Sequence, residues 1–398
     1  MPPPNITGDL HLGHGLGLTL QDILIRSHLE DGDKTLYLPG TDHGGLGTER
    51  KIRTIQRDRP FAIAANEWKK QCQSRIRQQL KSLQLAANWE QEEYTLSDRQ
   101  RRATLEAFST LNQQNRISYG SEGMLLDLRD LAPRAIALIE SGEIRIFPES
   151  ERKIAYHYLN DLRPWNISRR SQWGIRIPGS QERFDTWFTS CLWAIKAPQD
   201  KSYLPAATLL CGRDILFFWG IRSILMAIAL EDMIPFKELA LHGLIIGDDG
   251  RKMSKSSPNS KPLPEYIEKY GYQAMRLGFA LMFSPKKEIR FREDRIHYAQ
   301  KILRKLHNAE NLISRRSHLE DSLRTGILAE ISTLRIQQRQ HLLRYRFDLA
   351  AKELAGFIKE RYCGQYLENL KSRSDDMGWS EAAIALKELT KLLTIFTA

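Results

Sequence analysis

The sequence has few cysteines, and no two of them lie close together. Because no C-x-x-C pair occurs, a zinc knuckle or a disulfide framework is disfavoured, and a reducing, cytoplasmic location is expected. The start of the chain is rich in proline rather than basic and then apolar, so it does not read as a signal peptide. The four cysteines are Cys72, Cys191, Cys211 and Cys363.

Long apolar runs are missing as well. The most apolar segment, 215–230, is too short for a membrane span and contains Arg222, so it indicates a buried helix and no membrane partner. Neither an internal repeat nor a low-complexity segment is visible. With 41% apolar and 27% charged residues among 398, the composition predicts a globular protein of two or three domains.

The charge is strongly basic. A net charge of +11 points toward a polyanionic partner, although such a charge on its own more often reflects solubility.

The opening stretch predicts a loop that leads into a helix. Prolines at positions 2–4 forbid a helix, Gly8 permits a tight turn, and residues 16–29 have helical apolar spacing. The N–H groups of such a helix start favour phosphate, and His11 and His14 would add donors. A capped, solvated turn explains the same residues equally well.

Polar residues follow two predicted strands. Residues 34–45 form a short strand and a glycine-rich loop, where Asp42 could bind an ammonium group or its own backbone. Residues 207–211 read as a buried parallel strand, after which Asp214 could accept hydrogen bonds from ribose. The apolar residues that follow suit either a pocket or a core.

The remaining segments are less specific. Residues 61–116 read as crossover helices, 117–154 as a compact insertion, and 163–174 as a mixture of basic and aromatic residues that suits either stacking or packing. Another strand, 239–246, precedes a loop with two lysines three apart, which could reach phosphates or be plain surface. From 296 onward about four helices are expected as a bundle, with breaks near Gly326, Gly364 and Gly378.

Two short motifs together are far more specific than either alone. The sequence HLGH at 11–14 and the sequence KMSKS at 252–256 resemble the HIGH and KMSKS signatures of class I aminoacyl-tRNA synthetases. Further blocks resemble the valyl-tRNA synthetases within that class, and the matches spread over roughly residues 2–295. These blocks are 2–8, 40–44, 168–174, 185–188 and 214–219.

The resemblance implies an α/β fold, in which a Rossmann-type parallel-sheet catalytic domain precedes an α-helical bundle. It divides the chain into a first catalytic half with crossover helices (1–116), a short connective insertion in place of an editing domain (117–160), a second catalytic half (161–250), a KMSKS loop with a stem-contact region (251–295), and a reduced anticodon-binding-like bundle (296–398).

The resemblance also implies roles for individual residues. ATP is the expected cofactor, with Mg²⁺ carried on its triphosphate and no metal site in the protein. The catalytic residues would be His11, His14, Lys252 and Lys255. ATP would also contact Thr7, Gly13, Gly212, Asp214, His242, Gly243, Leu244, Met253 and Ser254. The amino acid would be bound by Pro3, Pro4, Asn5, Asp42, Trp187, Ile215 and Trp219.

The sequence departs from the family pattern in four ways. No strand precedes Pro2, so the sheet is expected to be one strand short or the chain truncated at its start. The editing domain is missing, the bundle is short and has no trailing coiled coil, and Ser257-Pro258 replaces the usual Lys-Gly. Without editing, threonine would pass an apolar valine pocket, which rejects an added hydroxyl only about a hundredfold.

Three functions are therefore weighed. The first is activation of a small branched amino acid, with valine favoured, and its transfer to a tRNA of the valine type without editing. The second is transfer of the aminoacyl group to a non-tRNA acceptor. The third is binding of tRNA without catalysis, which retention of the motif residues disfavours. The oligomeric state is left open.

Overall fold

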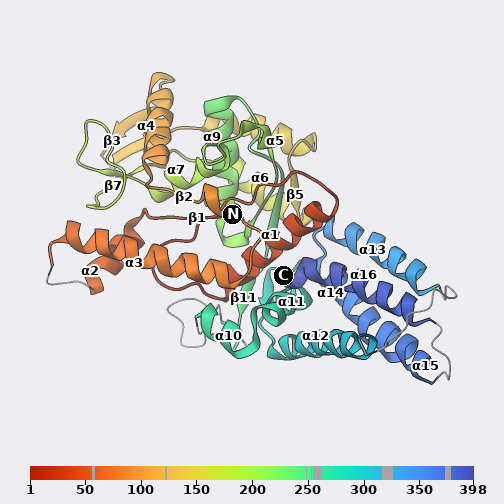
Figure 1. Ribbon diagram of the computed structural model, residues 1–398. Helices are drawn as coiled ribbons and strands as arrows, with labels where there is room; N and C mark the ends of the chain where they lie inside the picture. Colours follow the sequence, from red (N-terminus) through yellow and green to blue (C-terminus); the bar gives the residue numbers. More distant parts are fainter. Residues whose placement is uncertain are drawn as a thin grey trace. The chain divides into compact units, whose positions relative to one another are not determined.

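The computed structural model describes residues 1–55, 59–121, 123–247, 249–251, 253, 262–315, 326–372 and 378–398. The chain divides into two compact units that interleave along the sequence (Figure 1). The first unit contains Met1–Leu10, Thr35–Leu80 and Ala87–Leu244, and the second contains His11–Lys34, Lys81–Ala86 and Ile245–Ala398.

The first unit is built on parallel strand pairs. Strand β10 (Phe236–His242) lies between β5 (Arg145–Phe147) and β9 (Ala206–Gly212), and all three run parallel. A second parallel pair joins β1 (Gly40–Thr41) to β2 (Glu93–Tyr94). These pairings confirm the predicted α/β class, and β5 shows that the stretch predicted as an insertion contributes a strand to the central sheet.

The opening segment lies beside β1. Asn5 forms a parallel bridge with Asp42, because the Asp42 N–H donates to Pro4 O at 2.9 Å and the Ile6 N–H donates to Asp42 O at 3.1 Å. The opening segment therefore takes a strand-like position beside β1, whereas the absence of a strand before Pro2 stays a prediction.

The other elements of the first unit surround these sheets. Its remaining strands are β3 (Ile117–Gly120), β4 (Gly123–Leu126), β6 (Trp165–Asn166), β7 (Ser168–Arg169) and β8 (Arg183–Phe184). Its α-helices are α2 (Leu46–Ile55), α3 (Phe61–Ser82), α4 (Asp98–Gln113), α5 (Ala132–Glu140), α6 (Arg152–Asn160), α7 (Thr186–Cys191), α8 (Trp193–Lys196) and α9 (Arg222–Glu231). Its 3₁₀ turns are η1 (Trp89–Gln91), η2 (Arg129–Leu131), η3 (Glu149–Glu151), η4 (Lys201–Tyr203) and η5 (Arg213–Ile215), and η6 (Leu216–Ile221) is a π-helix.

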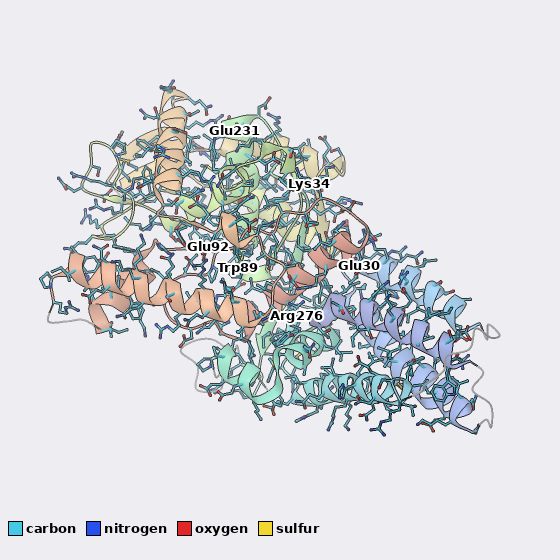
Figure 2. All side chains as sticks on the ribbon, in the orientation of Figure 1. Glu30, Lys34, Trp89, Glu92, Glu231 and Arg276 are labelled. Atoms are coloured by element: carbon cyan, nitrogen blue, oxygen red, sulfur yellow. The ribbon has the colours of Figure 1, made fainter. Side chains whose placement is uncertain are left out.

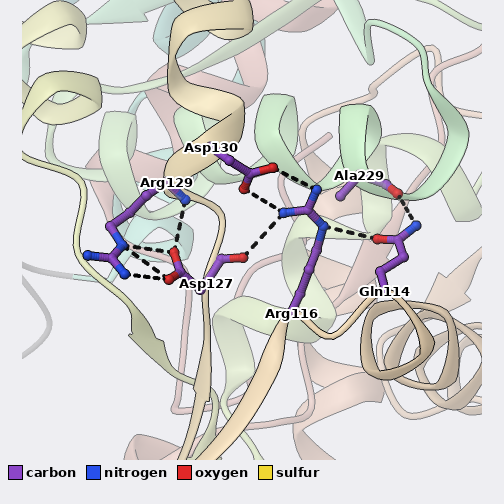
Figure 3. Close-up of polar contacts among 6 residues, drawn as sticks. All are labelled: Gln114, Arg116, Asp127, Arg129, Asp130 and Ala229. Carbon is purple, nitrogen blue, oxygen red and sulfur yellow. Dashed lines mark hydrogen bonds and ion pairs between the residues drawn. The ribbon is translucent and has the colours of Figure 1, made fainter.

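A polar network joins the end of α4 to its neighbours (Figure 3). Arg116 binds both carboxylate oxygens of Asp130, at 2.6 and 2.9 Å, and Gln114 donates to Ala229 O of α9 at 3.0 Å. Arg129 pairs with Asp127 in the same network. These bonds fix the β3–β4 hairpin and η2 against the helices that cover the sheet.

The second unit is mainly helical. Helices α11 (Tyr272–Met282), α12 (Glu293–Ile313), α14 (Phe347–Gly356) and α16 (Trp379–Thr397) pack on one another, and α1 (Leu12–Glu30) packs on α11 and α16. The other elements are β11 (Leu244–Ile246), which pairs with β12 (Glu288–Arg290), α10 (Leu263–Tyr270), α13 (Ile327–Leu342), the π-helix η7 (Phe357–Tyr366) and α15 (Leu367–Lys371).

Two of the predicted helix breaks in the bundle are correct and one is wrong. Gly326 and Gly378 directly precede α13 and α16 in the left-handed conformation. Gly364 instead lies inside η7, where an added Cβ would approach Lys359 O to 3.0 Å. The break that the sequence analysis missed follows α13, at Tyr345, whose φ is 55°.

The strand predicted over 239–246 is also two strands. β10 ends at His242 and β11 begins at Leu244, in a different sheet. Among the helices of the described residues, none is both long and apolar enough to cross a membrane.

A buried ion pair ties the second unit together. Arg276, labelled in Figure 2, is fully buried and donates to Asp22 Oδ2 at 2.6 Å, to Leu83 O at 3.1 Å and to Phe396 O at 3.2 Å. Asp22 also accepts from Arg26 at 2.6 Å and from the Ala86 N–H at 2.6 Å. One guanidinium and one carboxylate thus join α1, the turn at 81–86, α11 and the end of α16.

We predict that Arg276→Met destabilises the second unit. The substitution keeps most of the volume but removes one of the two arginines that pair with the buried Asp22, together with the buried hydrogen bonds to Leu83 O and Phe396 O, which costs about 3 kcal/mol of unfolding free energy. The control is Arg335→Met, which removes a partner of Glu388 in a surface ion pair worth less than about 1 kcal/mol. Urea unfolding of both variants measures the difference, and equal losses would contradict a structural role for the buried pair.

Candidate functional site

The residues predicted to form the site are divided between the two units. His11, Gly13, His14 and Met253 belong to the second unit, and the other described residues of the set belong to the first. Lys252, Ser254 and Lys255 lie outside the described residues.

Asp42 is the centre of one group. It follows β1, and its side chain is almost fully buried. Oδ1 accepts from the Gly44 N–H at 3.0 Å and from Thr95 Oγ1 at 2.7 Å, while Oδ2 accepts from Thr186 Oγ1 at 2.8 Å and from Ser190 Oγ at 3.4 Å. In the described part of the first unit, no lysine, arginine or histidine forms an ion pair with it. The carboxylate is therefore held by uncharged donors.

Burial dominates the electrostatics of Asp42. Loss of water raises the pKa of Asp42 above its ordinary value, and the four hydrogen bonds lower it in part. A cation placed beside this carboxylate would favour its charged form. The arrangement thus suits a positively charged ligand group better than a structural role that needs a neutral side chain.

Two other predicted residues lie against the Asp42 backbone. Pro4 accepts from the Asp42 N–H, and Asn5 forms the parallel bridge with it. Thr7 follows in the same segment, where its N–H donates to Asn5 O at 2.8 Å. Pro3 precedes them and is half-buried.

Aromatic side chains extend the group away from Asp42. Trp219 is buried and donates from Nε1 to Ser190 O at 2.9 Å, so the residue that holds Asp42 Oδ2 also holds Trp219. Trp187 stacks on Phe218 with ring centroids 5.3 Å apart. Ile215 is half-buried at the end of η5, just before the π-helix that carries Phe218 and Trp219.

We call Trp187, Phe218 and Trp219 the aromatic wall. Arg222 lies against one side of it. Its guanidinium lies 3.9 Å from the ring centre of Trp165 and 5.3 Å from that of Phe218, and its burial lowers the pKa of Arg222. The side chain is 8% exposed. It fixes Phe218, and through it Trp187, by cation–π contact.

The ends of β9 and β10 bring together a second group. His242 lies opposite Gly212 in the sheet register. A Cβ on Gly212 would lie 2.7 Å from Asp214 Oδ1 and 3.6 Å from His242 Cε1, so a larger residue would displace the Asp214 carboxylate from its place beside His242. His242 Nδ1 lies 2.9 Å from Gly243 O, and burial lowers the pKa of His242. Leu244 follows as the first residue of β11.

The start of α1 forms the third group. His11 is the N-cap: its Nδ1 accepts from the Gly13 N–H at 3.0 Å, and His14 Nδ1 accepts from the His11 N–H at 3.3 Å. When Nδ1 accepts, a neutral ring carries its proton on Nε2, which makes Nε2 the donor. No acidic residue occupies the first turn, so the positive end of the helix dipole is not neutralised there.

The opening motif had two interpretations, a phosphate-binding helix start and a capped turn, and this geometry is compatible with both. The histidines do cap the helix, and the same capping directs a donor on each ring toward other partners. A Cβ on Gly13 would lie 2.9 Å from His11 Cε1 and displace the ring, which explains the glycine between them. Binding of phosphate here stays a prediction.

Met253 is buried behind β11, and its N–H donates to Ile245 O at 3.0 Å. It lines a pocket of about 610 Å³ within the second unit. Three acidic residues, Asp249, Glu293 and Asp294, line the same pocket, together with Arg292, which pairs with Asp294 at 2.7 Å.

Sequence reasoning missed four residues of the first group: Thr95, Thr186, Ser190 and Arg222. Thr186 and Ser190 are four apart on one short helix, so their hydroxyls lie on the same face. That spacing could have indicated that both contact the same group. Thr95 follows a two-residue strand that leaves no periodic signal, and Arg222 acts through aromatic contacts that no motif records.

The buried His43, next to Asp42 in the chain, makes the free energy of unfolding depend on pH. Its side chain is fully buried, its Nε2 lies 2.8 Å from Thr41 Oγ1, and burial lowers the pKa of His43 to about 3. The unfolded chain binds a proton at this residue near pH 6.5, whereas the folded chain does not. The free energy of unfolding therefore falls as the pH drops below about 6.5, by up to about 1.4 kcal/mol per pH unit.

We predict that His43→Gln reduces this loss of stability between pH 6.5 and 5. Asp42, with its raised pKa, acts in the opposite direction, and His242 acts in the same direction, but both are present in each protein. Urea unfolding at the two pH values, with the exposed His307→Gln as control, isolates the His43 contribution. An unchanged pH dependence in His43→Gln would contradict a buried neutral imidazole.

The chain is similar to known proteins over most of its length. The family model described as tRNA synthetases class I (I, L, M and V) matches residues 1–129, 125–182 and 179–292. The valine–tRNA ligase of Symbiobacterium thermophilum is 24% identical over 641 aligned positions, which cover 99% of this chain and 70% of that protein. That of Zymomonas mobilis is 32% identical over 292 residues, 62% of this chain and 33% of that protein.

A solved structure supports the fold. Methionyl-tRNA synthetase of Mycobacterium tuberculosis bound by methionyl-adenylate has a TM-score of 0.80 to this chain at 14% identity, and the match covers 99% of this chain and 89% of that one.

Proposed function

The chain belongs to the class I tRNA synthetases, and from that premise we propose that it activates valine with ATP and transfers the aminoacyl group to a tRNA. An aminoacyl-tRNA ligase activity agrees with relatives named valine–tRNA ligase. The choice of valine and the identity of the tRNA are the proposed part. The observation that carries it is the buried carboxylate of Asp42.

An α-ammonium group is the ligand that Asp42 fits. The carboxylate is buried among uncharged donors, and the longest of its hydrogen bonds, from Ser190 at 3.4 Å, is the easiest to replace. An ammonium brings a full positive charge and three N–H donors. Its charge would lower the raised pKa of Asp42 and stabilise the ionised form.

The side chain of the amino acid would contact the aromatic wall. Trp219, the stacked Trp187 and the half-buried Ile215 provide apolar surface close to the residues that hold Asp42. Such a wall is largely apolar, so it favours a small branched apolar amino acid.

ATP would be bound by the other two groups. The ribose suits Gly212 and Asp214, and adenine suits the backbone at 242–244. The triphosphate suits the start of α1, where N–H groups and the Nε2 donors of His11 and His14 stabilise charge that grows as the carboxylate attacks the α-phosphorus. Lys252 and Lys255 would complete this stabilisation.

Mg²⁺ would arrive on the triphosphate rather than on a protein site. Among the described residues, the one group with metal-ligand chemistry is His28, Asp31 and Asp33, at the far end of α1 from His11. A helix of 19 residues places those two ends about 28 Å apart. That group therefore lies too far from His11 and His14 to hold a metal ion at the start of α1.

The absence of an editing domain is also proposed. The alignment with the Symbiobacterium protein runs over 641 positions, whereas this chain has 398 residues, so a long part of that relative has no counterpart here. This supports an enzyme without a second, hydrolytic editing site, in which selection of the amino acid depends on the amino-acid pocket alone.

Asp42→Asn tests the amino-acid site. The amide keeps the shape but removes the charge that pairs with the ammonium, and loss of one partner of a buried charge pair weakens binding by about a hundredfold. Valine-dependent exchange of pyrophosphate into ATP measures this as a raised KM for valine, with ATP binding retained. The exposed Asp161→Asn serves as the control. A normal KM for valine in Asp42→Asn would exclude the proposed role.

Threonine tests the absence of editing. An apolar pocket rejects threonine relative to valine by only about a hundredfold. We therefore expect threonine to support pyrophosphate exchange at that lower efficiency and threonyl-tRNA to accumulate without hydrolysis. Rapid deacylation of threonyl-tRNA by the protein would show that an editing activity is present.

A further inference from the structure

Three arginines lie side by side across the small sheet at 168–184. Arg169 of β7 is directly opposite Arg183 of β8, and Arg183 also forms an antiparallel bridge with Arg176. Residues directly opposite each other in antiparallel strands point to the same face. We call Arg169, Arg183 and Arg176 the arginine row.

The row lies on the outer face of this sheet. Ile175 and Ile177 are buried, whereas Arg176 between them is exposed, as strand alternation requires. Phe184 is buried and contacts Phe108 of α4 edge to face at 5.3 Å, so the neighbouring Arg183 points away from that contact. The inner face is thus packed core and the outer face is basic.

Two arginines of the row, Arg176 and Arg183, have no acidic partner among the described residues, whereas the third does. Arg169 pairs with Asp185 at 3.3 Å. Arg176 donates only to Ser180 O at 2.8 Å, and Arg183 donates to Gln181 O at 3.0 Å and to Glu182 O at 3.5 Å. Among the described residues, no carboxylate lies within 4.0 Å of either guanidinium. Like charges directly opposite destabilise a sheet, so this arrangement has a cost within the unit.

The surrounding charges leave the row basic. After burial, which is the main cause, the positive charges of Arg176 and of Arg101 on α4 lower the pKa of Arg183, and the negative charge of Glu49 raises it in part. The nearby carboxylate of Glu49 is bound by Arg53, by the Ser171 hydroxyl and by the Gln172 N–H. Glu182 pairs with Arg170 at 3.8 Å. The neighbouring acids are therefore directed to other partners.

We propose that Arg176 and Arg183 bind the phosphate backbone of the tRNA. This inference rests on the proposed function, because it specifies where the first unit contacts that substrate. Guanidinium groups without acidic partners suit phosphates, with that of Arg176 exposed and that of Arg183 partly buried, and bound phosphates would offset the repulsion between the arginines. The contact reads no bases, so it contributes affinity rather than sequence selection.

The test compares two double variants of the full chain. Arg176→Gln/Arg183→Gln removes both charges, and Arg176→Lys/Arg183→Lys keeps them. The single variant Arg129→Gln is the control, because Arg129 is an exposed arginine of the same unit that pairs with Asp127 (Figure 3). Binding of a valine tRNA transcript is measured as a function of salt concentration, and valine-dependent pyrophosphate exchange is measured alongside.

The Gln double variant should bind the transcript about tenfold more weakly at low salt, and its plot of log affinity against log salt should flatten by about 1.4 to 1.8 in slope, since two phosphate contacts are lost. The Lys double variant should retain most of the salt dependence, and Arg129→Gln should match the wild type. Pyrophosphate exchange should be unchanged in all three.

The outcomes separate this inference from the function on which it rests. Equal tRNA affinity and salt slope in the wild type and the Gln double variant would overturn the inference while leaving amino-acid activation intact. An equal loss in Arg129→Gln would also overturn it, since the effect would then be one of net charge. Absence of pyrophosphate exchange in the wild type would instead refute the proposed function.

Discussion

The first unit depends on one constraint, which is that the Asp42 carboxylate is buried without a cation from its own unit. Four uncharged donors from three other places in the chain converge on it. Thr95 follows β2, while Thr186 and Ser190 lie on α7, so meeting the needs of one carboxylate positions a strand end and a helix. Ser190 O on the same helix accepts the hydrogen bond from Trp219 Nε1. The helix that satisfies the Asp42 carboxylate therefore also positions the aromatic wall.

Local patterns in the sequence were enough to predict several elements. The helix after His11, the strand before Asp42, the strand that ends at Gly212 and the helical C-terminal region each have a periodicity or a turn residue that reflects nearby contacts. The α/β class came from the family resemblance, and these elements agree with it. The roles of the site residues came from the resemblance between motifs, and those roles and the domain boundaries stay predictions.

The remaining features depend on contacts that are distant in sequence. Arg276 meets Asp22 across 254 positions, and Thr95 meets Asp42 across 53, so neither pair leaves a periodic trace. The break at Tyr345 was missed because a left-handed tyrosine has no sequence signal, whereas glycine does. Gly364 misled for the opposite reason: its small size serves a widened helix turn rather than an end.

The π-helix at 216–221 has a consequence for how this wall can change. A π turn holds one residue more than an α turn, so the segment contains a surplus residue relative to a regular helix. Removal of one residue would allow the segment to rewind as an α-helix with α9 kept in phase, so the change would be confined to the turn that carries Phe218 and Trp219. Trp219 would then turn away from Ser190. Length changes in this segment therefore alter the pocket abruptly, while substitutions at the rim, such as at the exposed Phe218, alter it gradually.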